Sequence, residues 1–289
     1  NGCQSINTIF ACSEKIKKAN NSYVLFRFYE IPQADIADRI SIFTNSQSAV
    51  KPRDLRSNDK RIAAIKTAYE NAYRDGFLTT KRGQERPADR DEMKTMDVAL
   101  LAKCLMSWHC QRPNIAYNEN KLFDKYFDQL FRADYSPTDI HALNQWMQHI
   151  ERRWQEGSLG LNEALMAVPS YAKYHLLFGV QVCFCIASNH ADKVPAPSAT
   201  LPALSDPDPI ITLAANCYNS ALDAAVAEYQ EKGKVFSPQN WLKAKDSLNK
   251  VQASLRMYMG MMTSMPGGTE LKKRLALDAT QFSLRWSAD

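Results

Sequence analysis

Apolar residues recur at helical spacing along most of the chain, and one stretch has instead the character of a strand. Residues 23–29 are β-branched and aromatic and are followed by Pro32, which is typical of a buried strand. Around this run the pattern predicts a helix that begins at Gly2 and further helices over 34–45 and 52–73. The start of the chain is therefore expected to form a small α+β part.

The rest of the pattern is helical. Apolar residues at helical spacing predict helices over 93–108, 122–131, 136–154, 171–188, 210–230 and 237–265. The stretch 174–187 is very apolar, but it is shorter than the roughly 20 residues that span a bilayer, so a buried central helix is predicted and no membrane contact. The expected fold class is mainly α, with a small α+β N-terminal part.

Changes of composition suggest how the chain is divided. Residues 193–209 are rich in proline, alanine and serine, which indicates a linker. The other expected regions are a small α+β core at 1–90, truncated at its N-terminus, a helical domain at 91–192 and a C-terminal helical subdomain at 210–289. The hydrophobic fraction of 45% allows a substantial buried core.

Two polar stretches flank the expected strand, one at the start of a helix and one between two helices. The free amide N–H groups of a helix start favour an anion. Ordinary helix caps and turns use the same residue types, so residue chemistry leaves a ligand site and a capping role open. The candidate ligand-binding residues are Gly2, Cys3, Gln4, Ser5, Asn45, Gln47, Arg53, Asp54 and Arg56.

Basic residues gather in the same part of a chain whose formal net charge is only +5. If residues 52–73 form one helix, Arg53, Arg56 and Lys60 share a face that could follow a phosphate backbone. A solvated basic face explains the same pattern, and both interpretations stay open. The candidate nucleic-acid-binding residues are Lys51, Arg53, Arg56, Lys60, Lys81 and Arg82.

The order of these motifs resembles the AIPR family, the abortive infection phage resistance proteins of bacteria. The motifs are Asn-Gly-Cys-Gln-Ser at 1–5, Thr-Asn-Ser-Gln at 44–47 and Arg-Asp-Leu-Arg-Ser-Asn-Asp at 53–59, and similarity continues to Phe131. The resemblance implies a role in antiviral defence. It also implies an upstream nuclease-like domain as a partner.

A more distant resemblance is to the nucleotide-binding core of ParB and sulfiredoxin proteins, where a glycine turn and a later Asn-containing segment hold phosphates. It implies that backbone amides of residues 2–4 hold a phosphate and that Asn45 and Gln47 orient it. The turn lacks the His and Arg of sulfiredoxin, so Lys51, Arg53 or Arg56 would have to provide the positive charge. The cofactor that this resemblance allows is a nucleoside triphosphate with magnesium.

The remaining reactive residue types show no arrangement of a known centre. Seven cysteines lie at irregular spacings without a paired motif, which favours free thiols in a cytoplasmic protein and no metal site. No Ser/His/Asp, Cys/His or paired-carboxylate spacing marks a catalytic centre. No catalytic residue is therefore assigned, and whether the protein is an enzyme stays open.

Two functions of different classes follow. In the first, the chain is the sensing or regulatory part of an antiviral protein that binds a nucleotide or nucleic-acid phosphate and couples to an effector nuclease domain. In the second, it is a non-catalytic helical scaffold that assembles with copies of itself or with a partner. Joint substitution of Gln4 and Asn45 separates them, because only the first function predicts lost binding without unfolding.

Overall fold

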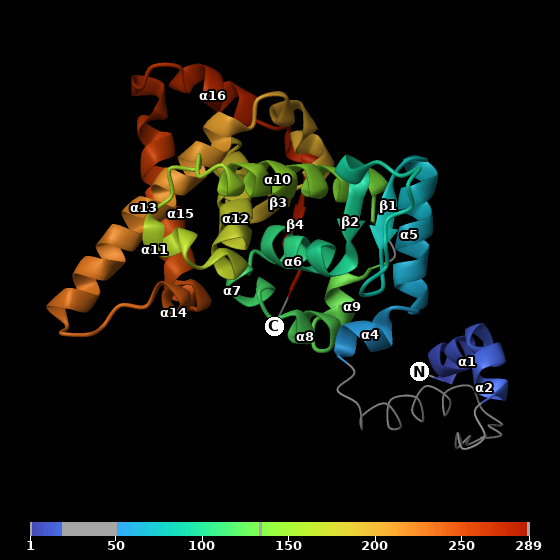
Figure 1. Cartoon of the computed structure of the whole chain (residues 1–289). Helices are drawn as coiled ribbons and strands as arrows, with labels where there is room; N and C mark the ends of the chain where they lie inside the picture. Colours follow the sequence, from blue (N-terminus) through green and yellow to red (C-terminus); the bar gives the residue numbers. More distant parts are fainter. Residues whose placement is uncertain (1, 19–50, 133–134, 288–289) are drawn as a thin grey trace. The chain divides into compact units, whose positions relative to one another are not determined.

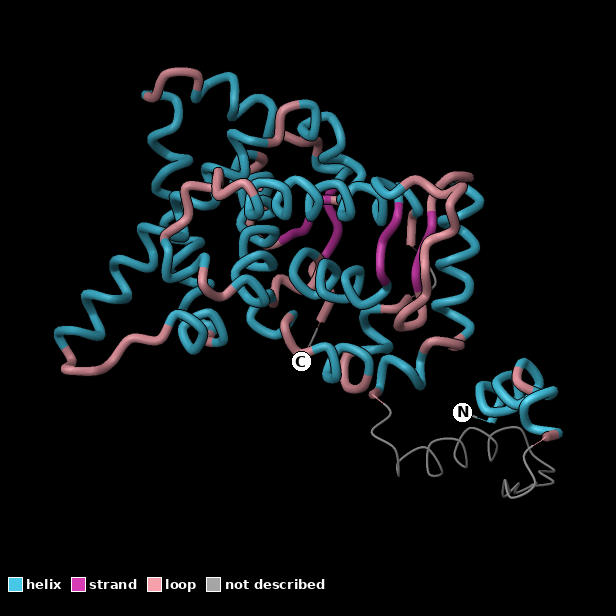
Figure 2. Tube along the Cα trace, viewed as in Figure 1, coloured by secondary structure: helices cyan, strands magenta, loops and turns pink. Residues whose placement is uncertain are grey.

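The computed structural model describes residues 2–18, 51–132 and 135–287. Contacts divide the chain into two compact units, Asn1–Lys51 and Pro52–Asp289, which we call the N-terminal unit and the main unit. Figure 1 shows the helices and strands of each unit with their labels, and Figure 2 shows that helices far outweigh strands. The protein is mainly helical, as the sequence predicts.

The N-terminal unit contains the helix expected at Gly2. Helix α1 covers Gly2–Ala11 and helix α2 covers Ser13–Lys17, which confirms the helical pattern at this end of the chain. The strand expected over 23–29 and the helix expected over 34–45 lie outside the described residues. The similarity to the ParB and sulfiredoxin core depends on those elements and stays a prediction.

The main unit opens with two helices where the sequence predicts one. Helix α4 covers Pro52–Arg56 and helix α5 covers Lys60–Ala72. The Asp59 carboxylate accepts the amide of Arg61 at 2.9 Å and so caps a new helix. The expectation of a single helix over 52–73 is wrong, because this local side-chain bond competes with continuation of the helix.

A two-stranded parallel sheet lies beside α5 (Figure 1). Strand β1 covers Phe77–Thr79 and strand β2 covers Thr95–Asp97, with Leu78 opposite Met96. The loop after β1 leads into the 3-10 helix η1, Glu92–Lys94. The motif at residues 53–59 covers most of α4 and the turn directly before α5, so it lies at this part of the main unit.

Helix α6 follows the sheet and covers Val98–Trp108. The sequence predicts a helix that begins at residue 93, but residues 95–97 pair with β1 instead. The Asp97 carboxylate accepts the amide of Ala99 at 2.8 Å and caps α6 at this point. The prediction is therefore correct for the helix and wrong for its start.

The middle of the main unit is helical. Its helices are α7 (Pro113–Ala116), α8 (Glu119–Phe123), α9 (Phe127–Leu130), α10 (Pro137–Gln155), α11 (Glu163–Met166) and α12 (Pro169–Ala187). Helix α10 begins where its Ser-Pro-Thr-Asp motif predicts, with the Ser136 hydroxyl accepting the Thr138 amide at 3.3 Å. The single helix expected over 122–131 is divided into α8 and α9, but its aromatic side chains are buried as predicted.

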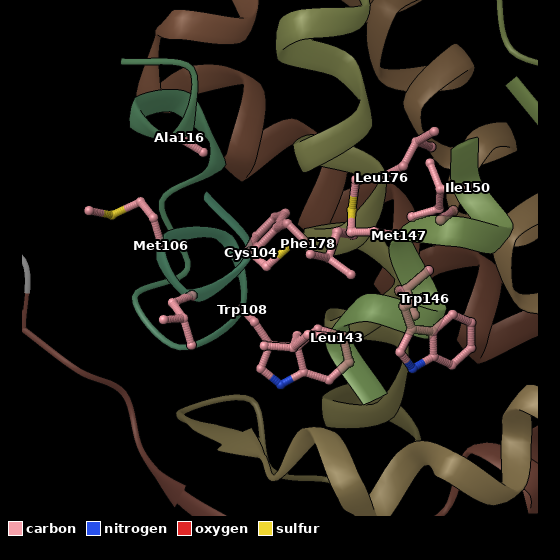
Figure 3. Close-up of a cluster of buried hydrophobic side chains, with 14 of the residues drawn as sticks. Cys104, Met106, Trp108, Ala116, Leu143, Trp146, Met147, Ile150, Leu176 and Phe178 are labelled. Atoms are coloured by element: carbon pink, nitrogen blue, oxygen red, sulfur yellow. The ribbon is translucent and has the colours of Figure 1, made fainter. Parts of the chain in front are cut away.

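Helix α12 is the buried central helix that the sequence predicts. It packs against α6, α10 and two helices nearer the C-terminus. Figure 3 shows Leu176 and Phe178 of α12 together with Cys104 and Trp108 of α6 and Trp146 of α10. Across the described ranges, no helix is long and apolar enough to cross a membrane.

The segment 193–209, for which the sequence predicts a linker, is packed into the main unit. Its 3-10 helix η2, Pro197–Ser205, lies against α10. The buried Thr200 hydroxyl accepts the indole N–H of Trp146 at 2.8 Å. The linker prediction is wrong, because a proline-rich composition says nothing about a partner so distant in the sequence.

The C-terminal part returns to the same core. It contains α13 (Asp208–Glu231), α14 (Pro238–Lys243), α15 (Lys245–Met261), η3 (Met262–Ser264), α16 (Gly268–Leu275) and η4 (Ala279–Gln281). Strand β4, Phe282–Leu284, pairs antiparallel with strand β3, Lys193–Pro195. One cluster of buried apolar side chains runs from Ile62 to Leu275, so these helices share their core with the rest of the main unit.

Candidate phosphate site

The glycine stretch of the candidate site lies in the N-terminal unit. Gly2 is the first residue of α1, and residues 3–5 follow it in the first turn. The sequence of this turn contains no acidic residue. Asn45 and Gln47 lie outside the described residues, and their joint role with Gly2 stays a prediction.

The arginine that opens the motif at residues 53–59 is buried. Arg53 is 8% exposed, and its guanidinium forms an ion pair with the Asp97 carboxylate. Its Nη1 atom lies 4.0 Å from the Glu119 carboxylate, and its buried Nε has no hydrogen-bond partner among the described residues. Arg53 therefore anchors α4 to the start of α6 and to α8, and protein carboxylates already compensate its charge.

Two further cations reach the same group of carboxylates. Arg82 lies 3.1 Å from Glu119 and 3.5 Å from Asp54, and Lys103 lies 3.9 Å from Glu119. We call this group the Arg53 network. Its members are Arg53, Asp54, Arg82, Asp97, Lys103 and Glu119. Three positive and three negative formal charges balance, which is how a protein holds partly buried charges without a ligand.

Three members of this network, Asp97, Lys103 and Glu119, are missed by reasoning from the sequence. Asp97 does carry a local signal, because an acidic residue directly before an apolar helical run is typical of a helix cap. Glu119 likewise follows Asn118, whose side chain caps α8. Neither signal points to Arg53, which lies 44 residues before Asp97 in the sequence.

Arg56 lies apart from the Arg53 network. Its guanidinium is 4.4 Å from the centroid of the Phe127 ring and 3.7 Å from the Asp59 carboxylate. Arg61 approaches the same ring at 4.5 Å and pairs with Asp128 at 2.7 Å. Burial raises the pKa of Asp59, but the bonds to Arg61 and the charge of Arg56 outweigh it, so this pKa lies below its ordinary value. These arginines are therefore partly compensated by carboxylates.

The other basic candidates are spread over separate elements. Lys51 precedes α4, Lys60 opens α5 and Lys81 lies in the loop after β1, and all three are exposed. Because α4 and α5 are separate helices, Arg53, Arg56 and Lys60 do not share one helical face. The expectation of that shared face is wrong.

Both polar motifs fall within one family match. A family model described as AIPR protein matches residues 1–251, which include the two motifs and the whole Arg53 network. The chain belongs to the AIPR family. Membership of this family indicates a bacterial abortive-infection or phage-resistance protein. No curated protein and no solved structure gives a significant match to the chain.

Buried histidines and cysteines of this AIPR protein are uncharged at neutral pH. Burial lowers the pKa of His109 and of His175 to about 3, and it raises the pKa of Cys110 to about 12 and that of Cys217 to about 11. These thiols are therefore poor nucleophiles. The described residues also contain no group of three or more His, Cys, Asp or Glu placed to hold a metal ion.

Proposed function

We propose that this AIPR protein is the sensing or regulatory part of an abortive-infection system. It binds a phosphate of a nucleotide or of a nucleic acid and passes the bound state to an effector nuclease domain. Membership of the AIPR family supports the defence role. The anchoring of the motif at residues 53–59 in the main unit supports the coupling.

The observation that carries this proposal is the double role of Asp97. Its Oδ1 atom accepts the amide of Ala99 at 2.8 Å and caps α6, while its Oδ2 atom pairs with Arg53 of α4. A movement of α4 therefore acts on the same carboxylate that holds the start of α6. Because α6 packs against α12 in the core, the network gives the motif a physical route into the main unit.

Exposed lysines around α4 supply charge for a phosphate polymer. Lys60 and Lys81 of the main unit are exposed, and they belong to different elements of the described structure. Cations spread in this way suit a polymer with many phosphates. Binding of such a polymer releases counterions, and it weakens steeply as the salt concentration rises because that release becomes less favourable. A nucleotide held by the first motif would depend on Gln4 and Asn45 instead and would resist salt.

The experiment is a thermal-shift and fluorescence-anisotropy series on the whole chain. The ligands are ATP, CTP, GTP and oligonucleotides of DNA and RNA, each at low and moderate salt. A ligand at a hundredfold excess over its Kd that binds only the folded state adds about 2.7 kcal/mol to the free energy of unfolding. The double variant Gln4→Ala/Asn45→Ala is expected to lose the part of the nucleotide response that the first motif supplies and to keep its ligand-free melting temperature.

The polymer response is tested with a second pair of variants. Lys60→Ala/Lys81→Ala is expected to weaken oligonucleotide binding and to reduce its dependence on salt. The matched control is Arg256→Ala, an exposed cation in α15 outside both motifs. Nucleotide binding of wild-type strength in the Gln4/Asn45 variant sinks the assignment of the first motif.

One observation favours a second function, a non-catalytic helical scaffold. The arginines of the second motif region pair with protein carboxylates, as in Arg53 with Asp97 and Arg61 with Asp128. In a scaffold none of the ligands raises the melting temperature, and the Gln4/Asn45 variant melts earlier because caps are lost. Analytical ultracentrifugation of the whole chain then tests self-assembly directly.

A further inference from the structure

A strongly basic pocket lies far along the chain from the motifs at residues 1–5, 44–47 and 53–59, which we call the AIPR motifs. It has a volume of about 370 Å³ and is lined by three cationic side chains, Arg112, Lys245 and Arg285. No carboxylate lines it among the described residues. A pocket of this size is within the range of small-molecule sites, which is roughly 300–1,000 Å³.

One wall of this basic pocket is the turn after α6. Gln111 has a φ of 52°, a left-handed conformation that ends the helix and turns the chain back, and the Arg112 amide donates to the Met106 carbonyl at 3.0 Å. Asn114, buried at 7% exposure, donates from its Nδ2 to the Lys243 carbonyl at 3.2 Å. The turn is thereby tied to the end of α14, directly before α15, whose first residues also line the pocket.

The second wall is the segment after β4. The Trp286 amide donates to the His109 carbonyl at 3.0 Å, and the two rings stack with centroids 4.1 Å apart and planes inclined by 8°. His109 is neutral, because burial and the charge of Arg132 lower its pKa to about 3. Arg285, next to Trp286, is therefore carried by a firmly attached segment.

Among the residues that the structure describes, two of the three cations of the pocket, Lys245 and Arg285, lack the carboxylate partners seen at the Arg53 network. Lys245 and Arg285 are exposed and form no ion pair with any residue of the described ranges. The neighbouring Asp246 pairs with Lys250 at 3.7 Å instead. Like charges gathered in one pocket repel each other, and an anion bound between them removes that cost.

The first two turns of α15 add a favourable field. Lys245, Asn249 and Gln252 line the pocket from one face of this helix. The N-cap residue, Ala244, offers no side-chain oxygen to the free amides of the first turn. The start of a helix of 17 residues thus presents its positive end beside two amide side chains that can donate hydrogen bonds.

A buried hydrogen-bond acceptor in the pocket wall indicates which class of ligand the pocket would bind. The Nδ2 atom of Asn114 bonds a carbonyl, which identifies the other amide atom as Oδ1, and this Oδ1 is buried without a partner in the described part of the chain. A buried unpartnered acceptor calls for a donor, such as a sugar hydroxyl or a base amino group. A nucleotide supplies both the phosphates for the cations and such a donor from its sugar or base.

We propose that this basic pocket binds a nucleotide, with its phosphates on Lys245 and Arg285 and a hydroxyl or amino group on Asn114. The site is built from residues 110–287 and does not depend on the phosphate function proposed for the AIPR motifs. Binding is non-covalent, since the Cys110 thiol in the wall stays protonated. The pocket gives the main unit a nucleotide site of its own.

The test is isothermal titration calorimetry on the whole chain at constant ionic strength, with ATP, pyrophosphate and adenosine. The variants are Lys245→Gln/Arg285→Gln, which removes both charges but leaves polar side chains, the control Arg256→Gln on the same helix as Lys245, and Gln4→Ala/Asn45→Ala. We expect the Kd for ATP to rise roughly tenfold or more in the first variant, because charge-assisted hydrogen bonds are lost. ATP should bind more tightly than pyrophosphate, and the control should stay within about twofold of wild type.

ATP binding in the two double variants shows whether ATP binds at the basic pocket or at the AIPR motifs. ATP binding that survives in the Gln4/Asn45 variant and falls in the Lys245/Arg285 variant supports the basic pocket, whatever happens at the AIPR motifs. An unchanged Kd in the Lys245/Arg285 variant overturns the proposal, as does an equal loss in Arg256→Gln. A ligand-free melting temperature within about 2 °C of wild type, a shift expected from less than 1 kcal/mol, shows that a loss of binding is not a loss of folding.

Discussion

Gly179 of α12 lies so close to Ala214 of α13 that an added Cβ would press against it. A Cβ atom at Gly179 would lie 3.0 Å from the Ala214 Cβ and 3.2 Å from Cε2 of Tyr218. The two helices pack closely along this contact, and α12 is the helix around which the main unit is built. The close approach therefore bears on the stability of the whole unit.

Gly179→Ala is expected to destabilise the protein. Overpacking of a core costs about 1–3 kcal/mol, which exceeds the gain of roughly 0.5–1 kcal/mol from removing a helical glycine. The matched control is Gly260→Ala in α15, where a Cβ meets no atom within 4 Å. That variant should be stabilised by about 0.4–1 kcal/mol. Urea denaturation measures both, and a Gly179→Ala variant as stable as wild type contradicts the packing.

Acid should unfold the protein partly through His175. Its Nε2–H donates to the Leu242 carbonyl at 2.9 Å, and its Nδ1 accepts the Tyr218 hydroxyl at 3.2 Å. Burial lowers its pKa to about 3. The unfolded chain therefore binds a proton at this residue near pH 6.5, whereas the folded protein does so only near pH 3. This contribution to stability is complete above pH 6.5 and is lost as the pH falls from there toward 3.

His175→Gln should flatten the pH dependence of stability. The wild-type free energy of unfolding should fall, through this residue, by up to about 1.4 kcal/mol per pH unit below pH 6. Denaturation by urea at a series of pH values gives the slope for each protein, independently of the stability lost by the substitution itself. A variant with the full wild-type slope would show that His175 is protonated in the folded state.

Local signals of the sequence predict the helices well. The start of α10 at Ser136 and the buried aromatic residues of α8 and α9 depend on caps and spacing within a few residues. The long apolar run of α12 likewise predicts that this helix is buried. What these predictions share is that every residue involved lies within one element.

Contacts between distant elements escape such reasoning. The packing of η2 depends on Thr200 meeting Trp146, and the burial of Arg53 depends on Asp97. Composition indicated a linker in the first case, and charge pattern indicated an exposed basic face in the second. The candidate site was therefore recognised as a motif, while the partners that compensate Arg53 were not.

The two functions of Asp97 can be separated by substitution. Asp97→Asn keeps an acceptor for the amide of Ala99 and loses the charge that pairs with Arg53, whereas Asp97→Ala loses both. Loss of a cap costs about 1 kcal/mol, so the Ala variant should be less stable than the Asn variant by about that amount. Equal stabilities in urea denaturation would mean that the cap contributes nothing to α6.

The last prediction concerns Arg53 against its neighbour Arg56. Arg53→Ala leaves the partly buried Asp97 carboxylate without its cation, whereas Glu119 keeps Arg82 and Lys103, and the loss of such a charged hydrogen bond costs about 1.5–3 kcal/mol. Arg56→Ala removes a side chain that is 40% exposed and 3.7 Å from its carboxylate, which is expected to cost about 0–1 kcal/mol. Urea denaturation of the two variants tests this difference.

The same pair of variants tests the coupling through Arg53. If the Arg53 network passes on the bound state, a ligand of the AIPR motifs should protect the amides at the start of α6 from hydrogen exchange in wild type. In Arg53→Ala that protection should disappear although the ligand still binds, and in Arg56→Ala it should persist. Persistence in both variants means that the network holds α4 in place without transmitting anything, because the link from Arg53 to Asp97 would then be dispensable for the response.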